Sequence, residues 1–419
     1  MYRICFIEAS QEAISENGVM MGDILTKQIL KRDRSLFSSD FEMHQEKLSQ
    51  SLSGSRVLVI GAAGSIGSSI AKQLSDYQLT CLHLVDVSEN NLVELVRDLR
   101  SSVRPLLSDF KAMPLDLGSL EFRRFLQSEK EYDYVLNLAA MKHVRSEKDP
   151  YSLIRMYNTN VLYLKQLLDA LENQAVKKLF SVSTDKAVNP VSLMGATKRF
   201  MERLLHVYSK AVPCATARFA NVAFSDGSLL YSFQKRFSKR QPLPVPLDIR
   251  RYFISHEEAA QLCLLSCICG DNRDVYFPKM EENNDLVSFY DLVELFLSSK
   301  GYKAQVFYTE REAKQAVSHL RSQSKKWPVY LSESDTSGEK KNEQFFDANE
   351  GVDFDRYHKI GVIHQSETDG DKGVLKAIDE IEKIKEGDKW RKEDILDAIR
   401  IAVPELDHLE KNRNLDQKM

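Results

Sequence analysis

Residues 57–67 read Val57-Leu58-Val59-Ile60-Gly61-Ala62-Ala63-Gly64-Ser65-Ile66-Gly67. The apolar run predicts a short buried strand, and the glycines predict a tight turn into a helix over 68–74. Such a turn lets a pyrophosphate approach the backbone, while the helix N-terminus offers free N–H groups and a partial positive charge. We therefore expect a dinucleotide to bind here, and a purely structural turn is the alternative. The expected cofactor-binding residues of the turn are Gly61, Gly64, Ser65, Ile66 and Gly67.

An aspartate ends the next predicted strand, 81–86. Asp86 follows the last glycine at about the twenty-residue spacing at which an acid binds the adenosine ribose hydroxyls. A carboxylate there would repel a 2′-phosphate, so the pattern favours NAD over NADP as the cofactor.

Four more short apolar segments, at 111–114, 134–138, 179–183 and 214–219, alternate with amphipathic stretches. Parallel strands need long crossovers, so this alternation predicts an α/β fold with a Rossmann-like, doubly wound parallel sheet. We expect a helical N-terminal extension at 1–54, an NAD-binding domain at 55–220, a smaller substrate-binding lobe at 221–350 and a helical C-terminal tail at 351–419.

The later part of the chain is less regular. Alternate prolines at 242, 244 and 246 exclude a helix and predict an extended linker over 241–246. Residues 332–342 are polar and are expected to form a loop. Helices are expected at 291–299, 310–324, 371–385 and 391–402.

Composition excludes several classes of protein. With 419 residues, 43% hydrophobic and 28% charged, the chain is typical of globular proteins. The net charge of −3 gives no overall field that would attract nucleic acid or anionic lipid. No apolar run approaches the roughly 18 residues of a membrane span, and no signal peptide is recognisable. We expect a cytoplasmic protein with no nucleic-acid partner, and apolar faces near both ends predict a homo-oligomer.

Three of the six cysteines, Cys263, Cys267 and Cys269, share one apolar segment. Their spacing would allow a metal site, but no histidine or further cysteine lies at a ligand-like spacing nearby. A buried, reduced helix is the preferred interpretation, and no metal is expected.

Ligands of open parallel sheets bind at the carboxyl ends of the strands. Two segments fit that position, Asp116-Leu117 after the third strand and Ala139-Ala140 after the fourth. Asp116 would meet the adenine, or would instead cap a helix. Lys142 and His143 follow the alanines and would reach the substrate, although His143 is equally compatible with a structural role.

The fifth predicted strand ends in Ser183-Thr184-Asp185-Lys186, and Met194-Gly195-Ala196-Thr197-Lys198 follows on a helix. An Asp-Lys pair is most often a surface turn, but here it directly follows an apolar strand. We expect burial to lower the pKa of Lys186 towards neutrality and to let Asp185 hold a proton. The i, i+4 spacing places Met194 and Lys198 on one helix face.

Seven segments occur in order: GAAGSIG, NLAAMKHV, YNTNV, STDKAVNP, MGATKRFMERL, RFANV and RRYF. Together they resemble the nucleotide-sugar 4,6-dehydratases of the extended short-chain dehydrogenase family, in the branch that acts on UDP-N-acetylglucosamine. The resemblance runs from about residue 55 to 346 and is looser over 278–326. It implies a nucleotide-sugar substrate and a reaction in which NAD is regenerated at each turnover.

The resemblance also implies roles for individual residues. Lys186 matches the base at sugar C5, Asp185 matches the acid at C6, and Thr184 matches the hydrogen-bond partner of the C4 hydroxyl. Lys198 matches the lysine that binds the nicotinamide ribose. Matches to residues around the nucleotide and its diphosphate are Asn221, Arg251 and Lys340.

Met194 occupies the position at which this family usually has a tyrosine. It is similar in this respect to a subgroup of the family that has methionine at that position. A thioether neither donates nor takes up the C4 hydroxyl proton. Water, Asp185 or the Lys198-ribose pair would have to take it, and Met194 would pack against the ligands. A 4-epimerase and a non-catalytic dinucleotide-binding regulator are the alternative functions.

Overall fold

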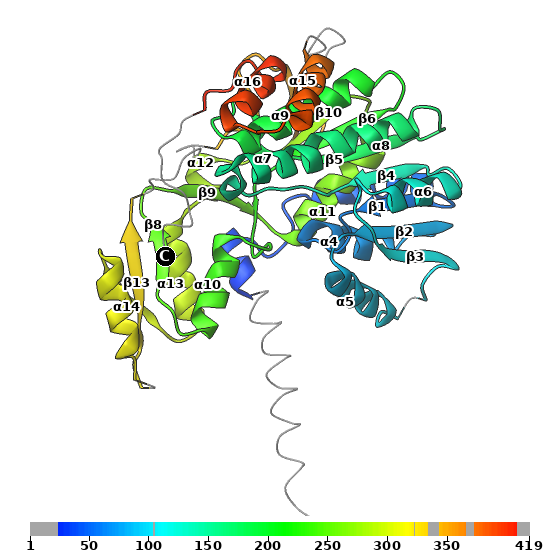
Figure 1. Ribbon diagram of the computed structural model, residues 1–419. Helices are drawn as coiled ribbons and strands as arrows, with labels where there is room; N and C mark the ends of the chain where they lie inside the picture. The colour runs from blue at the N-terminus through cyan, green and yellow to red at the C-terminus, as the bar shows by residue number, and fades with distance from the viewer. Residues whose placement is uncertain (1–23, 104, 322, 334–342, 366–372, 409–419) are drawn as a thin grey trace, which may run out of the picture.

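A nine-stranded sheet forms the centre of the larger part of the molecule (Figure 1). The computed structural model describes residues 24–408, except 104, 322, 334–342 and 366–372. The strand order is β14-β15-β10-β6-β5-β4-β1-β2-β3, and all neighbours from β10 to β3 are parallel. β14 and β15 complete the sheet as antiparallel strands. The strands are β1 (Arg56–Ile60), β2 (Cys81–Asp86), β3 (Asp109–Pro114), β4 (Tyr134–Asn137), β5 (Lys178–Thr184), β6 (Cys214–Phe219), β10 (Asp274–Pro278), β14 (Val352–Asp353) and β15 (Ile360–His364).

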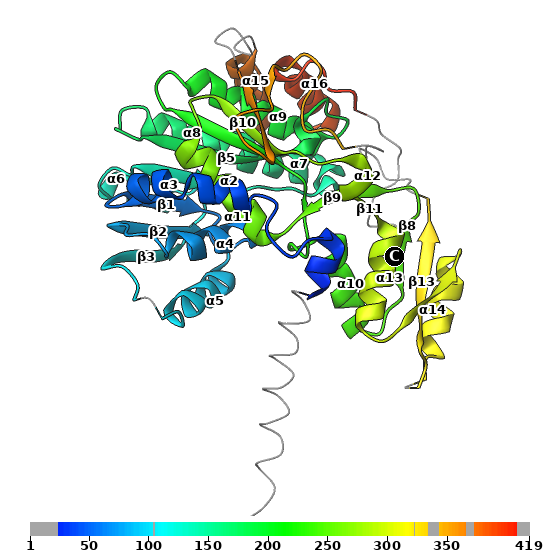
Figure 2. The same cartoon turned by 180° about the vertical axis from the view of Figure 1, so that it is seen from behind.

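Helices cover both faces of this sheet, which explains why its central strands are buried along almost their whole length (Figures 1 and 2). One face packs against α4 (Ser65–Leu74), α5 (Glu89–Arg100) and α11 (His256–Leu264). The other packs against α6 (Leu120–Ser128), α7 (Pro150–Tyr157), α8 (Tyr163–Leu171) and α9 (Leu193–Tyr208). The doubly wound sheet predicted from the alternating pattern is therefore confirmed.

A smaller lobe has its own apolar core and a second sheet, ordered β12-β13-β8. Its elements are α10 (Leu229–Ser238), β8 (Leu243–Pro246), α13 (Phe289–Ser299), β12 (Lys303–Phe307), α14 (Glu310–Ser318) and β13 (Lys326–Ser332). A third sheet, ordered β11-β9-β7, connects the larger part of the molecule with the smaller lobe. Its strands are β7 (Asn221–Val222), β9 (Arg250–Ile254) and β11 (Leu286–Ser288).

The structure corrects two expectations for this region. The proline-rich segment is extended as predicted, but it is a strand of the lobe rather than a linker, because β8 pairs in parallel with β13. It lies at the edge of its sheet, where prolines are tolerated because fewer N–H groups are needed. The helix expected over 310–324 ends at Ser318, and the loop expected over 332–342 lies mostly outside the described residues.

The predicted domain boundaries do not follow the sheets. Within 221–350, α11 and β10 return to the large sheet, and within 351–419 the chain adds β14 and β15 before its helices. Sequence patterning misses this return because α11 and β10 are separated from the other large-sheet strands by the elements of the lobe. The C-terminal helices are α15 (Val374–Glu386) and α16 (Lys392–Ala402).

The described part of the N-terminal extension is helical, as predicted, at residues 24–30, α2 (Ser38–Met43) and α3 (Gln45–Leu52). Ion pairs and hydrogen bonds of its charged side chains, as well as apolar packing, attach this extension to the rest of the structure. Arg32 forms an ion pair with buried Glu258 on α11. The buried carboxylate of Asp40 accepts hydrogen bonds from the backbone N–H groups of His358 and Lys359.

Candidate active site

The glycine turn between β1 and α4 is packed too closely for side chains. Gly61 has a φ of +75°, and a Cβ there would lie 2.7 Å from the backbone nitrogen of Ala139. A Cβ on Gly67 would lie 2.2 Å from the carbonyl oxygen of Gly61. The turn, the first turn of α4 and the segment after β4 are thus drawn together at the carboxyl edge of the sheet. This backbone-lined cradle fits the pyrophosphate of a dinucleotide.

Asp86 lies beside this turn at the end of β2. Its carboxylate accepts hydrogen bonds from the backbone N–H groups of Ala63, at 2.9 Å, and Ser88, at 2.8 Å. Each oxygen keeps a lone pair for a further donor, so the carboxylate is both oriented and able to accept a ribose hydroxyl. Ser65 exchanges hydrogen bonds with Asp226, and Ile66 packs against the core.

The residues predicted to bind the cofactor after β3 and β4 differ in their contacts and burial. Asp116 accepts from the N–H of Gly118 and pairs with Arg155 at 3.3 Å. It does not cap α6, because Ser119 holds that position and accepts from the N–H of Phe122. The Leu117 side chain belongs to the apolar core, whereas Ala139 and Ala140 are partly exposed.

Thr184, Asp185 and Lys186 contact one another at the end of β5. The Thr184 hydroxyl donates to the Asp185 carboxylate at 2.8 Å, and the Lys186 ammonium lies 3.1 Å from the same oxygen. The first turn of α9 lies against this segment because Gly195 has no side chain, and a Cβ there would lie 2.2 Å from the Lys186 carbonyl oxygen. The sequence correctly predicts that these groups lie at the end of a strand.

The expected low pKa belongs to a different lysine. Burial works to lower the pKa of Lys186, but the carboxylates of Asp185 and Glu343 outweigh it and raise that pKa. Lys198 forms no ion pair with the described residues, and burial, only partly opposed by the charge of Glu202, lowers its pKa to about 7. The prediction of a near-neutral Lys186 is therefore wrong for this structure, because its ammonium is held between acids.

Lys198 and Met194 are both buried on α9, as their helical spacing predicts. The Lys198 ammonium donates to the carbonyl oxygen of Val182 at 3.0 Å and to the thioether sulfur of Met201 at 3.8 Å. The N–H of Met194 donates to Glu147. Behind the helix, Asn160 binds both Met141 and Thr197, so it ties the segment after β4 to α9.

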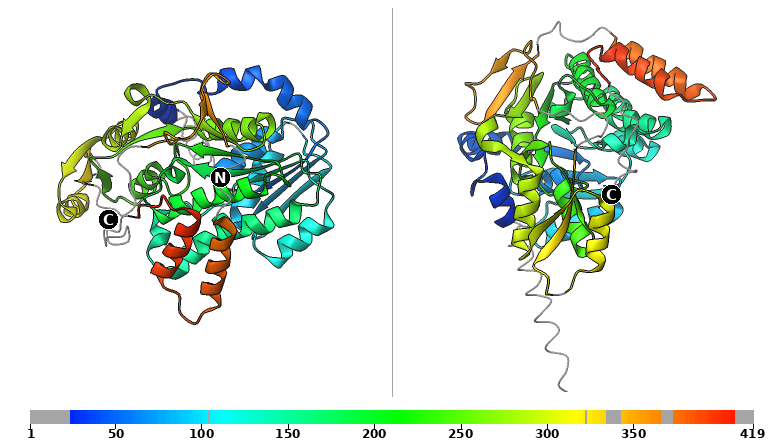
Figure 3. Two further views of the ribbon diagram at one scale, coloured as in Figure 1. Left: turned by 90° about the horizontal axis from the view of Figure 1, so that it is seen from above. Right: turned by 90° about the vertical axis from the view of Figure 1, so that its left-hand side faces the viewer.

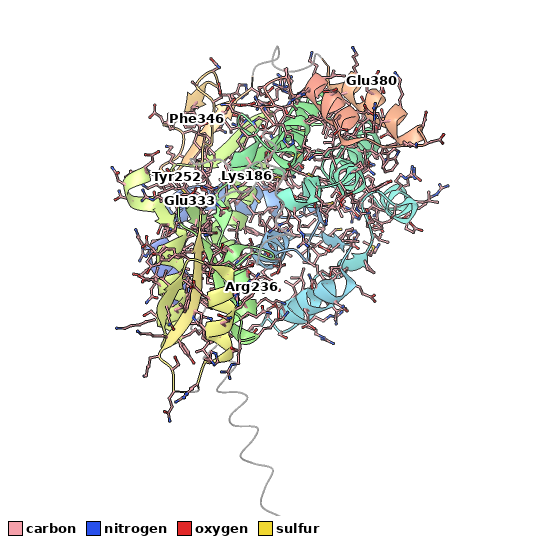
Figure 4. The ribbon with its side chains drawn as sticks, turned by 60° about the vertical axis from the view of Figure 1, so that its left-hand side comes forward. Lys186, Arg236, Tyr252, Glu333, Phe346 and Glu380 are labelled. Atoms are coloured by element: carbon pink, nitrogen blue, oxygen red, sulfur yellow. The ribbon has the colours of Figure 1, made fainter. Side chains whose placement is uncertain are left out.

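Sequence reasoning missed Glu343, which joins three of the predicted residues. Asn221 donates to its carboxylate at 2.5 Å, the Arg251 guanidinium lies 3.5 Å away and the Lys186 ammonium lies 4.0 Å away. The N–H of Tyr252 donates to its second oxygen at 2.8 Å. Lys186 and Tyr252, both labelled in Figure 4, therefore lie on either side of the Glu343 carboxylate. No local signal distinguishes this glutamate in a polar stretch 157 residues after Lys186.

The structure gives fewer contacts for the remaining residues that were predicted to bind the substrate. The Lys142 ammonium lies 3.5 Å from the Ser225 hydroxyl. The His143 ring lies against Gly227, where a Cβ would approach it to 2.5 Å. Lys340 lies outside the described residues.

A buried ionic cluster lies beside β5 and β6. Arg218 on β6 pairs with Glu202 of α9 at 2.8 Å and with Glu350 at 2.6 Å, and it donates to the carbonyl oxygen of Phe345. The Ser183 hydroxyl donates to Glu202, whose pKa is held at about 2 because Arg218 outweighs burial. The cluster binds β5, β6, α9 and the segment that carries Glu343 into one unit.

The cysteines Cys263, Cys267 and Cys269 are buried, and burial raises the pKa of each thiol. Among described residues, the group with metal-ligand geometry is instead Cys81, His83 and Asp109, at the opposite edge of the sheet. His83 already binds Tyr132 and Asp109, and Asp109 also pairs with Arg56. These polar groups therefore satisfy one another as a partly buried network.

Residues 57–350 match a family model described as "Polysaccharide biosynthesis protein". The chain belongs to this family. An uncharacterized membrane protein of Methanocaldococcus jannaschii, MJ1061, is 31% identical over 261 residues, which are 59% of this chain and 74% of that one. The match spans only 43% and 51% of two longer relatives. No helix in the described ranges has both the length and the apolar character that a membrane crossing requires.

Two relatives with stated activities are more distant. The inverting UDP-N-acetylglucosamine 4,6-dehydratase of Campylobacter jejuni is 29% identical over 238 residues, 54% of this chain and 67% of that one. The UDP-glucose 4-epimerase of Rickettsia bellii is 27% identical over 232 residues, 53% and 65%. The crystal structure of Pen from Bacillus thuringiensis shares the fold, with a TM-score of 0.61, 22% identity and coverage of 75% and 88%.

Proposed function

We propose that this chain is an NAD-dependent dehydratase that converts a UDP-N-acetylhexosamine, most simply UDP-N-acetylglucosamine, into its 4-keto-6-deoxy product. The observation that carries the proposal is the direct contact of Thr184, Asp185 and Lys186 at the end of β5. Dehydration needs an acid at C6 and a base at C5, whereas a 4-epimerase removes no C5 proton. The dehydratase relative from Campylobacter jejuni supports this choice.

The glycine cradle at Gly61 and Gly67 would hold the pyrophosphate of NAD, and Asp86 would accept a ribose hydroxyl. Lys198 would donate to the second ribose, exchanging its weak hydrogen bond to the Met201 sulfur for one to a ribose hydroxyl. The chemistry that bound NAD supplies is removal of a hydride from sugar C4 and its return to C6.

Protons move through the side chains at the end of β5. Thr184 accepts the C4 hydroxyl proton while its own proton passes along its hydrogen bond to Asp185. The protonated Asp185 then gives that proton to the C6 hydroxyl, which leaves as water. Lys186 removes the C5 proton and later returns a proton to C5, so each side chain ends in its starting state.

The test is incubation of the purified protein with NAD and UDP-N-acetylglucosamine, followed by mass spectrometry of the nucleotide sugar. A product lighter by one water supports dehydration. Lys186→Gln should abolish it without loss of NAD binding, and Lys177→Gln is the matched control, because Lys177 precedes the opposite end of the same strand. Unchanged turnover in Lys186→Gln would rule out the proposed base.

A 4-epimerase is the second candidate, favoured by the Rickettsia bellii relative. It would give a product of unchanged mass with an inverted C4, which NMR of the sugar ring distinguishes. A non-catalytic regulator would bind NAD and give neither product.

A further inference from the structure

Glu343 has a buried side chain in the site, and hydrogen bonds fix the position of its carboxylate. Its side chain is 2% exposed, and its two oxygens accept separate hydrogen bonds from Asn221 and the backbone of Tyr252. Its segment is fixed from behind, since Arg218 donates to the carbonyl oxygen of Phe345 and pairs with Glu350. The carboxylate is thus held in place beside Lys186 by several elements.

The proposed reaction leaves one proton without a destination. Lys186 stands as an ammonium paired with Asp185, yet it must be a neutral amine to remove the C5 proton. Asp185 cannot take the lysine's proton, because it receives the C4 hydroxyl proton through Thr184. The other carboxylate that pairs with Lys186 among the described residues is Glu343.

We propose that Glu343 is a positioning residue that accepts the surplus proton of Lys186 and so frees Lys186 to act as the C5 base. The inference rests on the proposed dehydratase function. In the exchange, an ammonium and a carboxylate become an amine and a carboxylic acid, and the total charge is unchanged. The two groups are 4.0 Å apart, so a small movement of the flexible lysine brings them into contact.

The electrostatics of Glu343 agree with this role. Burial, followed by the charge of Asp185, raises its pKa to about 7, although Lys186, Arg251 and the N–H of Tyr252 work in the opposite direction. Within the part of the chain that the structure describes, these charged and polar groups face it, together with the amide of Asn221 and the phenol of Tyr252. The raised pKa brings this carboxyl group closer to the pKa of the amine, so the uphill transfer from Lys186 costs less than it would to an ordinary glutamate.

The first test compares pH profiles of kcat for wild type, Glu343→Gln and Glu343→Asp, with Asp347→Asn as a control on the same segment. Without the acceptor, Lys186 must lose its proton to solvent. The ratio of Glu343→Gln to wild type should therefore rise with pH, by up to about tenfold per unit, whereas Glu343→Asp should keep the wild-type shape. A ratio that stays constant across pH, or a fully active Glu343→Gln, would overturn the proposal.

The second test does not depend on turnover. Infrared difference spectra between acidic and alkaline pH should show a protonated-carboxyl band that titrates near neutrality, is lost in Glu343→Gln and persists in Asp347→Asn. Lys186→Gln should move its midpoint to higher pH, because Lys186 lowers the pKa of Glu343. Absence of the band in wild type, or no shift in Lys186→Gln, would refute the exchange. If the band and its shift are present but no dehydration is observed, the proposed function is wrong and the proton exchange between Lys186 and Glu343 still stands.

Discussion

At the scale of single residues, the proposed reaction assigns to Thr184 and Asp185 the proton transfer that Met194 cannot perform. Met194 is 3% exposed, and its thioether has no proton to exchange, so its contribution here is packing. The Thr184 hydroxyl already donates to Asp185 at 2.8 Å, which gives the C4 proton a path that needs no tyrosine. In the proposed reaction the same proton then leaves with the C6 hydroxyl.

Thr184→Val tests this path, because valine keeps the shape and removes the hydroxyl. We expect kcat to fall by about 10²–10⁴-fold, the usual range for loss of a proton-transfer group, while Thr184→Ser keeps most activity. Steady-state kinetics on UDP-N-acetylglucosamine provide the measurement. Equal activity of the valine and serine variants would exclude the path through Thr184.

Lys198 gives a prediction about stability in the protein without cofactor. Its pKa is about 7 when folded and near 10.5 when unfolded, so the unfolded chain binds more protons between these values. The free energy of unfolding should therefore gain from this group as pH rises from 7, by at most about 1.4 kcal/mol per pH unit. Urea titrations at pH 7, 8 and 9 should show a smaller rise in Lys198→Met, and parallel curves would contradict the low pKa.

At the scale of elements, the contact between α9 and the segment after β5 decides the geometry of the site. Gly195 brings the helix against the Lys186 carbonyl, and Ser192 caps the helix by accepting from the N–H of Gly195. Because α9 begins at this point, its Lys198 lies beside the end of β5.

Gly195→Ala should show that this contact is needed. Alanine normally stabilises a helix by about 1 kcal/mol relative to glycine. Here its Cβ would displace α9 from Lys186, so we expect a loss of about 1–3 kcal/mol and lower activity. Gly351→Ala is the control, because no atom lies within 4 Å of that Cβ position. Urea unfolding and the dehydration assay measure both effects, and a stabilised, fully active Gly195→Ala would contradict the close contact.

The elements also show which parts of the fold are predictable from sequence. The first six strands and the polar segment after β5 are predictable because period and turn chemistry are local properties. The partnership of Glu343 with Lys186 depends on a chain return over 157 residues, for which one sequence carries no signal. β8 was missed for a related reason, since its partner β13 lies more than 80 residues later.

At the scale of the whole molecule, the described helices nearest the two termini pack against the cores of the fold, the helix at residues 24–30 against the smaller lobe and the others against the large sheet. α15 and α16 form a pair outside α7 and α9, as Figure 3 shows, and their apolar residues join the same core. The described N-terminal helices bury Leu25, Ile29 and Leu48. The apolar faces that led us to expect a homo-oligomer are thus largely covered within the chain, and the oligomeric state remains a prediction.

Ile399 tests the contribution of this outer pair. Its side chain is fully buried in α16, so Ile399→Ala should cost about 2–5 kcal/mol of stability. Leu375→Ala on the neighbouring helix is the matched control, because Leu375 is 46% exposed and should cost far less. Denaturant titrations of both variants compare them, and equal losses would mean that the pair does not pack as described.

The most direct test of the central claim is the reaction with UDP-N-acetylglucosamine in heavy water, followed by mass spectrometry and NMR of the sugar. We predict a 4-keto-6-deoxy product that has lost one water and carries solvent deuterium at C5, with no label introduced at C4. A sugar of unchanged mass with inverted C4, or a dehydrated product without deuterium at C5, would contradict the assignment of Lys186 as a C5 base that exchanges with solvent.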